Sequence, residues 1–187
     1  MGGVDSYINT ELLFDLTLKN RIHSSSIKHG FVPGEAAGFF LITTAKRAEK
    51  SKMPILGRIK AVGSTMEEKT FLTGKTCLGQ GLSKAVSNVL KKIPKETVID
   101  KVYCDLNGER FRTEEYNYLL SRNSNLISDP GSYITTSRSY GDIGAATLAS
   151  LINLAVHHNE EQTTGLFFTG SDSGIRSAAI IEIAPTA

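Results

Sequence analysis

The sequence predicts an α/β fold in which helices cover the faces of a sheet. Two observations indicate this class: predicted helices and strands alternate along most of the 187-residue chain, and the predicted strands are short and almost continuously apolar. No linker, repeat or low-complexity run divides the chain. We therefore expect one domain that spans residues 1–187.

The first third of the chain is predicted to hold two short helices and two strands. Asn9 or Thr10 can cap the first helix, and Pro54 ends a second helix that is rich in basic residues. Runs or alternation of apolar residues indicate the strands. The predicted elements are a helix over residues 10–20, a strand over 38–44, a helix over 45–52 and a strand over 55–63.

The rest of the chain predicts a regular alternation of helix and strand. Apolar residues three and four positions apart mark helices, as Leu82, Val86, Val89 and Leu90 do. Short apolar runs between turn residues mark strands. The predicted elements are a helix over residues 82–92, strand 98–103, helix 113–120, strand 132–136, helix 143–156 and strands 165–169 and 177–183.

Composition excludes several classes of function. With 21 basic and 19 acidic residues the net charge is +2, which is too balanced for a nucleic-acid-binding surface. The longest apolar stretch, residues 143–156, is shorter than the about 20 residues of a membrane span, and the N-terminus shows no signal peptide. The two cysteines make neither a disulfide framework nor a zinc site. We expect a cytoplasmic protein without metal or cofactor.

Two apparent motifs carry no function. The triplet Gly74-Lys75-Thr76 resembles the end of a phosphate-binding loop, but such a loop needs a glycine where this chain has Lys69. His157 and His158 are adjacent, so on a helix their side chains diverge by about 100° and cannot share a metal ion. A favourable position at a helix C-terminus explains these two histidines.

Polar residues follow the predicted strand 98–103 and form the best-placed candidate site. Cys104, Asp105, Asn107 and Glu109 lie between this strand and the next helix, and ligands of open α/β sheets bind at the carboxyl ends of strands. An Asn-Gly turn after a strand would also explain the segment without any function. A cysteine nucleophile needs a base, and no histidine lies near Cys104 in the sequence.

Several segments together resemble a known family. Residues 30–37 read G-F-V-P-G-E-A-A, and they are preceded by Gly3-Val4-Asp5-Ser6 and followed by Ala45-Lys46-Arg47 and by the Ile59–Gly63 segment I-K-A-V-G. These segments are similar to the middle of a β-ketoacyl-acyl carrier protein synthase of the thiolase superfamily. The resemblance continues at lower identity to the C-terminus. It implies a thiolase-like fold, of which this chain is the C-terminal half.

The resemblance also implies that catalytic residues are missing. The family's nucleophilic cysteine belongs to the first half of the fold, and neither cysteine here matches its setting. The loop of the family's first histidine corresponds to residues 104–108, and Asp142 stands at the position of the second. The candidate catalytic residues are therefore Cys104 and Asp142, with Asp105 and Glu109 as weaker ones. The candidate ligand-binding residues are Asn107, Gly108, Ser137, Gly141 and Gly174.

These substitutions predict a protein that has lost condensing chemistry. In the family the two histidines donate hydrogen bonds to the developing enolate, whereas an ionised Asp142 only accepts them. We therefore expect a non-catalytic subunit or adaptor that pairs with an N-terminal half, on a separate or cleaved polypeptide, or with a second copy of itself. The segment V-Y-C-D-L-N-G-E-R-F-R also resembles ketosynthase-like proteins associated with bacterial secretion loci.

Two other functions remain open. One is an acyltransferase or thioester hydrolase, which would use Cys104 with Asp105 and Glu109, or a cysteine supplied by a partner chain as in 3-oxoacyl-acyl carrier protein synthases. The other is a module that binds acyl chains or acyl carrier protein. Lys46, Arg47 and Lys50 could contact an acidic carrier, although a solvated helix face explains them as well.

Overall fold

The structure is a computed structural model, and it describes residues 1–123, 126–127, 129, 131–157 and 160–185. Its centre is a mixed five-stranded sheet, so the predicted α/β class is confirmed. β4 pairs in parallel with β5 and β6, and β7 pairs antiparallel with β6 and β3. Across the sheet the strands are β3 (Gly57–Met66), β7 (Ile175–Ile183), β6 (Thr163–Gly170), β4 (Lys101–Cys104) and β5 (Tyr133–Ile134).

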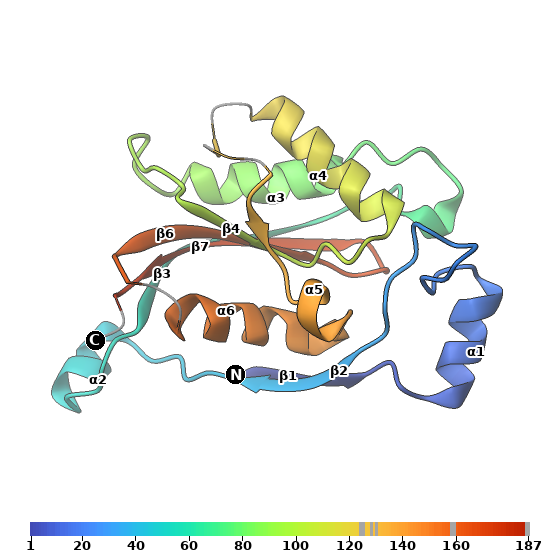
Figure 1. Ribbon diagram of the computed structural model, residues 1–187. Helices are drawn as coiled ribbons and strands as arrows, with labels where there is room; N and C mark the ends of the chain where they lie inside the picture. The colour runs from blue at the N-terminus through green and yellow to red at the C-terminus, as the bar shows by residue number, and fades with distance from the viewer. Residues whose placement is uncertain (124–125, 128, 130, 158–159, 186–187) are drawn as a thin grey trace.

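Helices cover both faces of this sheet (Figure 1). On one face lie α3 (Gln80–Leu90) and α4 (Arg110–Arg122), and on the other lies α6 (Thr147–His157). The larger part of the core lies between α3 and the sheet. The apolar stripe of this helix, including Val86 and Val89, is fully buried there. The smaller part lies between α6 and strands β4, β6 and β7. None of the described helices is long and apolar enough to cross a membrane.

A two-stranded sheet lies beneath α6 and adds a further layer (Figure 1). It consists of β1 (Gly2–Ser6) and β2 (Glu35–Phe39), which pair antiparallel. Glycines permit its close contact with the helical layer, since a Cβ on Gly3 would lie 1.9 Å from the Ala145 carbonyl oxygen. We call this pair of strands the ribbon.

Short helices occupy the connections. Asn9 caps α1 through its side-chain oxygen, and Thr44 caps α2 in the same way, as the sequence predicts for the first of them. The connecting helices are α1 (Thr10–Leu18), α2 (Ala45–Lys50), η1 (Phe71–Thr73), α5 (Ser137–Tyr140) and η2 (Gly144–Ala146).

Several predicted boundaries are wrong; for example, the helix expected over 113–120 is α4, which begins at Arg110 and ends at Arg122. The strand expected over 38–44 lies earlier in the chain, since β2 begins at Glu35 and ends at Phe39. The small residues of this segment pack closely against the helical layer, as Gly38 does against Ala149. The helix expected over 143–156 is interrupted near its start, where Gly144 adopts a φ of +52° and a short 3-10 helix precedes α6. The strand expected over 98–103 begins only at Lys101. Of the predicted histidine pair, His157 ends α6 and His158 lies outside the described residues.

Candidate functional site

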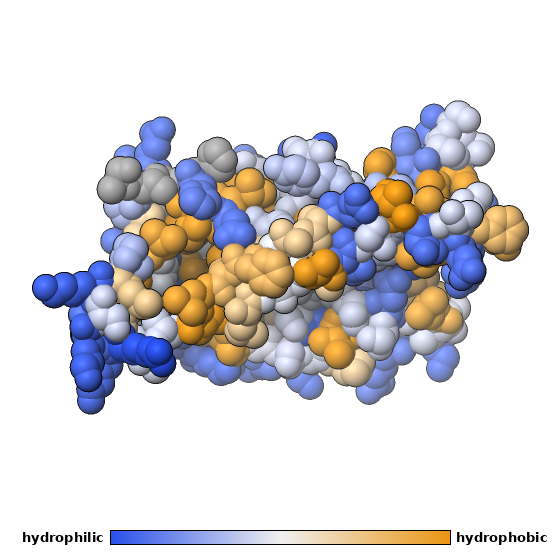
Figure 2. All heavy atoms as spheres, turned by 90° about the horizontal axis from the view of Figure 1, so that it is seen from below, coloured by the Kyte–Doolittle hydropathy of each residue, from blue (hydrophilic) through white to orange (hydrophobic). Residues whose placement is uncertain are grey.

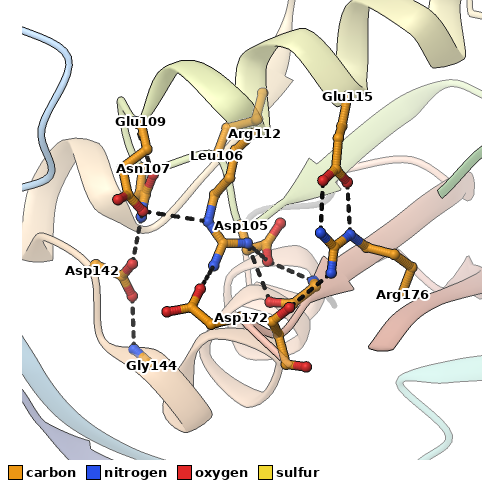
Figure 3. A network of polar contacts seen from close by, with 12 residues as sticks. Asp105, Leu106, Asn107, Glu109, Arg112, Glu115, Asp142, Gly144, Asp172 and Arg176 are labelled. Atoms are coloured by element: carbon orange, nitrogen blue, oxygen red, sulfur yellow. Dashed lines mark hydrogen bonds and ion pairs between the residues drawn. The ribbon is translucent and has the colours of Figure 1, made fainter. Parts of the chain in front are cut away.

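The polar residues that follow β4 lie at one end of the sheet, where two other loops meet them. These loops precede η2 and connect β6 to β7, and they bring in Asp142 and Asp172. Figure 3 shows the resulting network of polar contacts. We call Asp105, Asn107, Glu109, Asp142, Asp172 and the two arginines that bind three of these carboxylates, Arg21 and Arg112, the acidic cluster.

Asn107 joins the two loops that the resemblance singles out. Its Nδ2 donates to Asp142 Oδ2 at 2.6 Å and to Glu109 Oε2 at 3.0 Å (Figure 3). The other carboxylate oxygen of Asp142 accepts the backbone N–H of Gly144 at 2.9 Å. The structure therefore brings Asp142, predicted from a distant part of the sequence, into direct contact with the segment after β4.

Two arginines hold three of the four carboxylates. Arg21 donates through Nε and Nη2 to both Glu109 oxygens, at 2.7 and 2.9 Å, and through Nη1 to Asp172 at 2.6 Å. Arg112 donates through Nη1 to Asp105 at 2.8 Å, and its Nη2 lies 3.5 Å from Asp172. The Arg21–Glu109 pair is bidentate, and such pairs are strong and directional, so it fixes the orientation of both side chains.

The acidic cluster carries an excess of negative charge. Its four carboxylates face two guanidinium groups. Burial raises the pKa of the Asp105 carboxyl, and the neighbouring Arg112 and the Gly170 N–H oppose this shift. The negative charge also affects Tyr7. Burial raises the pKa of the Tyr7 hydroxyl to about 12, and the charges of Asp142 and Asp172 are the next largest causes of this shift. The site therefore favours positive rather than negative charge in its surroundings.

Cys104 points away from this cluster. Its side chain is fully buried in the core beneath α3, among apolar residues that include Leu82 and Leu119. Burial raises the pKa of the Cys104 thiol to about 12, and burial is also the largest cause that raises the pKa of Cys77 to about 11. Because the thiolate is the reactive form, both cysteines are poor nucleophiles in this fold.

We predict that neither thiol reacts quickly in the folded protein. A pKa of about 12 leaves about one part in ten thousand of Cys104 as thiolate at pH 8. Labelling with iodoacetamide at pH 8, followed by mass spectrometry, should modify Cys104 only after unfolding in urea, and Cys77 slowly. A Cys104→Ala variant identifies the peptide. Rapid native labelling of Cys104 would contradict its placement in the core.

The other predicted ligand-binding residues shape the backbone of the loops at this end of the sheet, through a hydrogen bond to a carbonyl group or a positive φ angle. The Ser137 hydroxyl donates to the Leu106 carbonyl oxygen at 2.6 Å. Gly108, Gly141 and Gly174 have φ values of +101°, +75° and +105°, a region that favours glycine. The hollow beside Arg112 has a volume of about 10 Å³, which leaves room for no more than about one water molecule. No group of three side chains suited to a metal ion occurs in the part of the chain that the structure describes.

The sequence interpretation missed the basic half of the network. Arg112 follows Glu109 by three residues at the start of α4, so helical spacing could have indicated it. Arg21 and Asp172 are 151 residues apart, and no local signal connects them. A second buried pair, Glu115 with Arg176, lies next to the cluster and was also missed (Figure 3).

Comparison with known proteins identifies the fold. No family model matches the chain, and no curated protein does. Three similar solved structures are the ketosynthase from module 6 of the bacillaene synthase of Bacillus subtilis 168 (TM-score 0.79, 16% identity), a type II PKS acyl-carrier protein in complex with its ketosynthase (0.75, 12%) and the oxazolomycin ketosynthase domain of Streptomyces albus JA3453 (0.72, 11%).

These matches cover 99%, 97% and 100% of this chain, respectively. They confirm the thiolase-like fold expected from the resemblance. In the other direction they cover 42%, 55% and 41% of the ketosynthase chains. The protein therefore has the fold of one part of a ketosynthase and spans about half the length, or less, of the solved chains it matches.

Proposed function

We propose that this chain is a ketosynthase-like subunit that has lost condensing chemistry and acts by binding other proteins. The observation that supports it best is the pair Asn107 and Asp142. Asp142 stands where the resemblance expects a catalytic histidine, and both of its carboxylate oxygens accept hydrogen bonds, one from Asn107 and one from the Gly144 N–H, so it donates none.

The chemistry of the acidic cluster opposes decarboxylative condensation. That reaction develops negative charge on a thioester oxygen, which needs donors aimed at it. Both oxygens of Asp142 accept hydrogen bonds, and the amide nitrogen of Asn107 already donates to Asp142 and Glu109. The surplus of carboxylates would further raise the energy of an enolate. Neither of these residues can therefore replace a histidine donor.

A binding role agrees with the extent of the fold. More than half of the bacillaene ketosynthase chain has no counterpart in this one. We infer that the missing part, an N-terminal half on a separate or cleaved polypeptide, or a second copy of this chain, associates with it. The narrower form of this role is an accessory subunit of a bacterial secretion system, and it rests on the resemblance of residues 102–112 alone.

The alternative function is acyl transfer on acyl thioesters, with a partner chain supplying the nucleophilic cysteine. It is favoured by one observation: a structural neighbour is a ketosynthase in complex with its acyl-carrier protein, bound to a hexaketide. In that case the exposed basic residues of α2, Lys46, Arg47 and Lys50, are the contacts we propose for an acidic carrier.

We predict no release of carbon dioxide from malonyl-acyl carrier protein. The protein is purified with its natural partners from its own cells and incubated with ¹⁴C-malonyl carrier protein, and the volatile label is counted against buffer. The rate should not exceed the buffer rate, because neither Asn107 nor Asp142 offers a free donor for the enolate. Turnover that Asp142→Asn abolishes, with Cys77→Ala as the unaffected control, would overturn the proposal and support the alternative.

A further inference from the structure

Asn107 is the one asparagine of the chain that a glycine follows. In such a pair the backbone nitrogen of the glycine can attack the side-chain amide carbon of the asparagine, because the glycine carries no side chain that hinders the approach. In an unfolded chain this reaction converts asparagine to aspartate or isoaspartate. The sequence therefore places a pair that is prone to deamidation in the middle of the candidate site.

The folded protein opposes this reaction. The Asn107 side-chain oxygen accepts the backbone N–H of Glu109 at 3.0 Å, and its Nδ2 donates to Asp142 at 2.6 Å and to Glu109 at 3.0 Å (Figure 3). The amide group is thus held at both of its polar atoms, and leaving this position costs those hydrogen bonds. Asn107 is also only 7% exposed. The attacking nitrogen must lose its proton beside carboxylates, which raises the energy of the anion.

The product does not fit the place of Asn107. An aspartate there puts a carboxylate at hydrogen-bond distance from Asp142 and Glu109, where the amide now donates to both. Carboxylates that share such a site cannot all be ionised, so one takes up a proton or moves away. Isoaspartate carries the main chain through the side-chain carbon, which lengthens the turn that Gly108 makes with a φ of +101°. Either product removes the amide donor that joins Asp142 to Glu109.

The loop of Asp142 also connects the acidic cluster to the ribbon. Its backbone N–H donates to the Val32 carbonyl oxygen at 2.7 Å, and its carbonyl oxygen accepts from Gly34 at 2.9 Å, immediately before β2. The outer face of the ribbon is apolar, as Figure 2 shows, and Val4 and Phe39 are each 67% exposed. A ribbon released from the acidic cluster adds its inner face to this surface, and large exposed apolar surfaces favour aggregation.

We propose that Asn107 is a modification site under the control of folding: it stays unreacted while the acidic cluster is closed and deamidates when the cluster opens. The Gly108 nitrogen gives up its proton and forms a bond to the side-chain carbon of Asn107, the bond from this carbon to Nδ2 breaks, and ammonia leaves with that proton. Water then opens the resulting cyclic imide to aspartate or isoaspartate. The product chain cannot close the acidic cluster again, so each reaction is a lasting loss of the native form. This inference is independent of the proposed function, since it involves no partner.

Deamidation in buffer and in urea tests the control by folding. The full chain is incubated at pH 8 with or without urea, and the tryptic peptide of residues 102–110 is followed by mass spectrometry. We expect the reaction in buffer to be at least about tenfold slower, because it must pass through openings of the acidic cluster. Equal rates in the two solutions would overturn the control by the fold. A peptide that stays unmodified in urea would overturn the site itself.

An alanine variant tests the contact that holds the amide. Asp142→Ala removes one acceptor of Asn107 Nδ2, so the reaction in buffer should become at least about threefold faster while the rate in urea stays the same. Asp15→Ala is the matched control, because it removes an exposed partner of Lys19 and should leave both rates within about twofold. If Asp142→Ala and Asp15→Ala react at the same rate in buffer, the acidic cluster does not protect Asn107 and the inference is wrong.

The aspartate variant shows the effect of the product and needs no incubation. In Asn107→Asp, hydrogen exchange over residues 32–39 should be at least about tenfold faster than in the wild-type chain, and light scattering should show self-association. Asn117→Asp makes the same chemical change at an exposed position of α4 and is the control. An Asn107→Asp chain that exchanges like the wild type would mean that the acidic cluster accepts the product, and the loss would then not be lasting.

Discussion

Replacing Arg176 by methionine should lower the free energy of unfolding by about 3–5 kcal/mol. Arg176 binds both oxygens of Glu115 at 2.6 Å each, and the two side chains are only 4% and 5% exposed. Its Nη1 also donates to the Ser171 carbonyl oxygen at 2.7 Å. The variant leaves a carboxylate buried, with the weak contact to the Cys77 thiol as its remaining side-chain partner among the described contacts.

Urea unfolding at pH 7, followed by circular dichroism, measures this loss. The control is Lys19→Ala, which removes an exposed pair with Asp15 and should cost less than about 0.5 kcal/mol. The double variant Arg176→Met with Glu115→Leu should recover most of the stability, because it removes the unpaired charge together with its partner. A loss below about 1 kcal/mol in the single variant would show that Glu115 is not held as the structure has it.

Periodicity in the sequence predicted the helices that form the core. In α3 the apolar residues recur at helical spacing, and all of Leu82, Val86 and Val89 are buried. The N-terminal strands lack such a signal. β1 reads Gly-Gly-Val-Asp-Ser, and its small residues are explained only by α6 and η2 against them, a contact between segments more than 100 residues apart. Such tertiary constraints are not visible in a local pattern.

Local sequence patterns likewise predicted only part of the candidate site. Asp105, Asn107 and Glu109 were predicted because a strand end gathers side chains, and they do lie together. Cys104 was a candidate by the same reasoning, but side chains alternate along a strand. Tyr103 therefore faces α6, and Cys104 enters the core beneath α3. The arginines that complete the site come from separate elements, so only the folded chain shows them.

The arginine contacts make the acidic cluster a structural junction. Arg21 belongs to the connection between α1 and β2, whereas Glu109 and Asp172 belong to the end of the five-stranded sheet. Its guanidinium also lies 4.7 Å from the Phe71 ring centroid, in a cation–π contact. The carboxylates thus hold the N-terminal segment, and with it the ribbon, against the rest of the molecule.

Arg21→Met should therefore loosen the N-terminal segment more than the sheet. Without the Arg21 guanidinium, Glu109 keeps a side chain that is only 5% exposed and loses its closest positive charge. Arg112 is then the one arginine left in the acidic cluster. We expect the free energy of unfolding, measured in urea, to fall by about 3 kcal/mol. Hydrogen exchange should accelerate over residues 1–40 and change little in β6 and β7. Arg110→Met, which removes an exposed pair with Glu114, is the control and should be nearly neutral. Uniform acceleration across the chain would instead mean that Arg21 stabilises the whole fold, and that the ribbon is held by its packing on α6 alone.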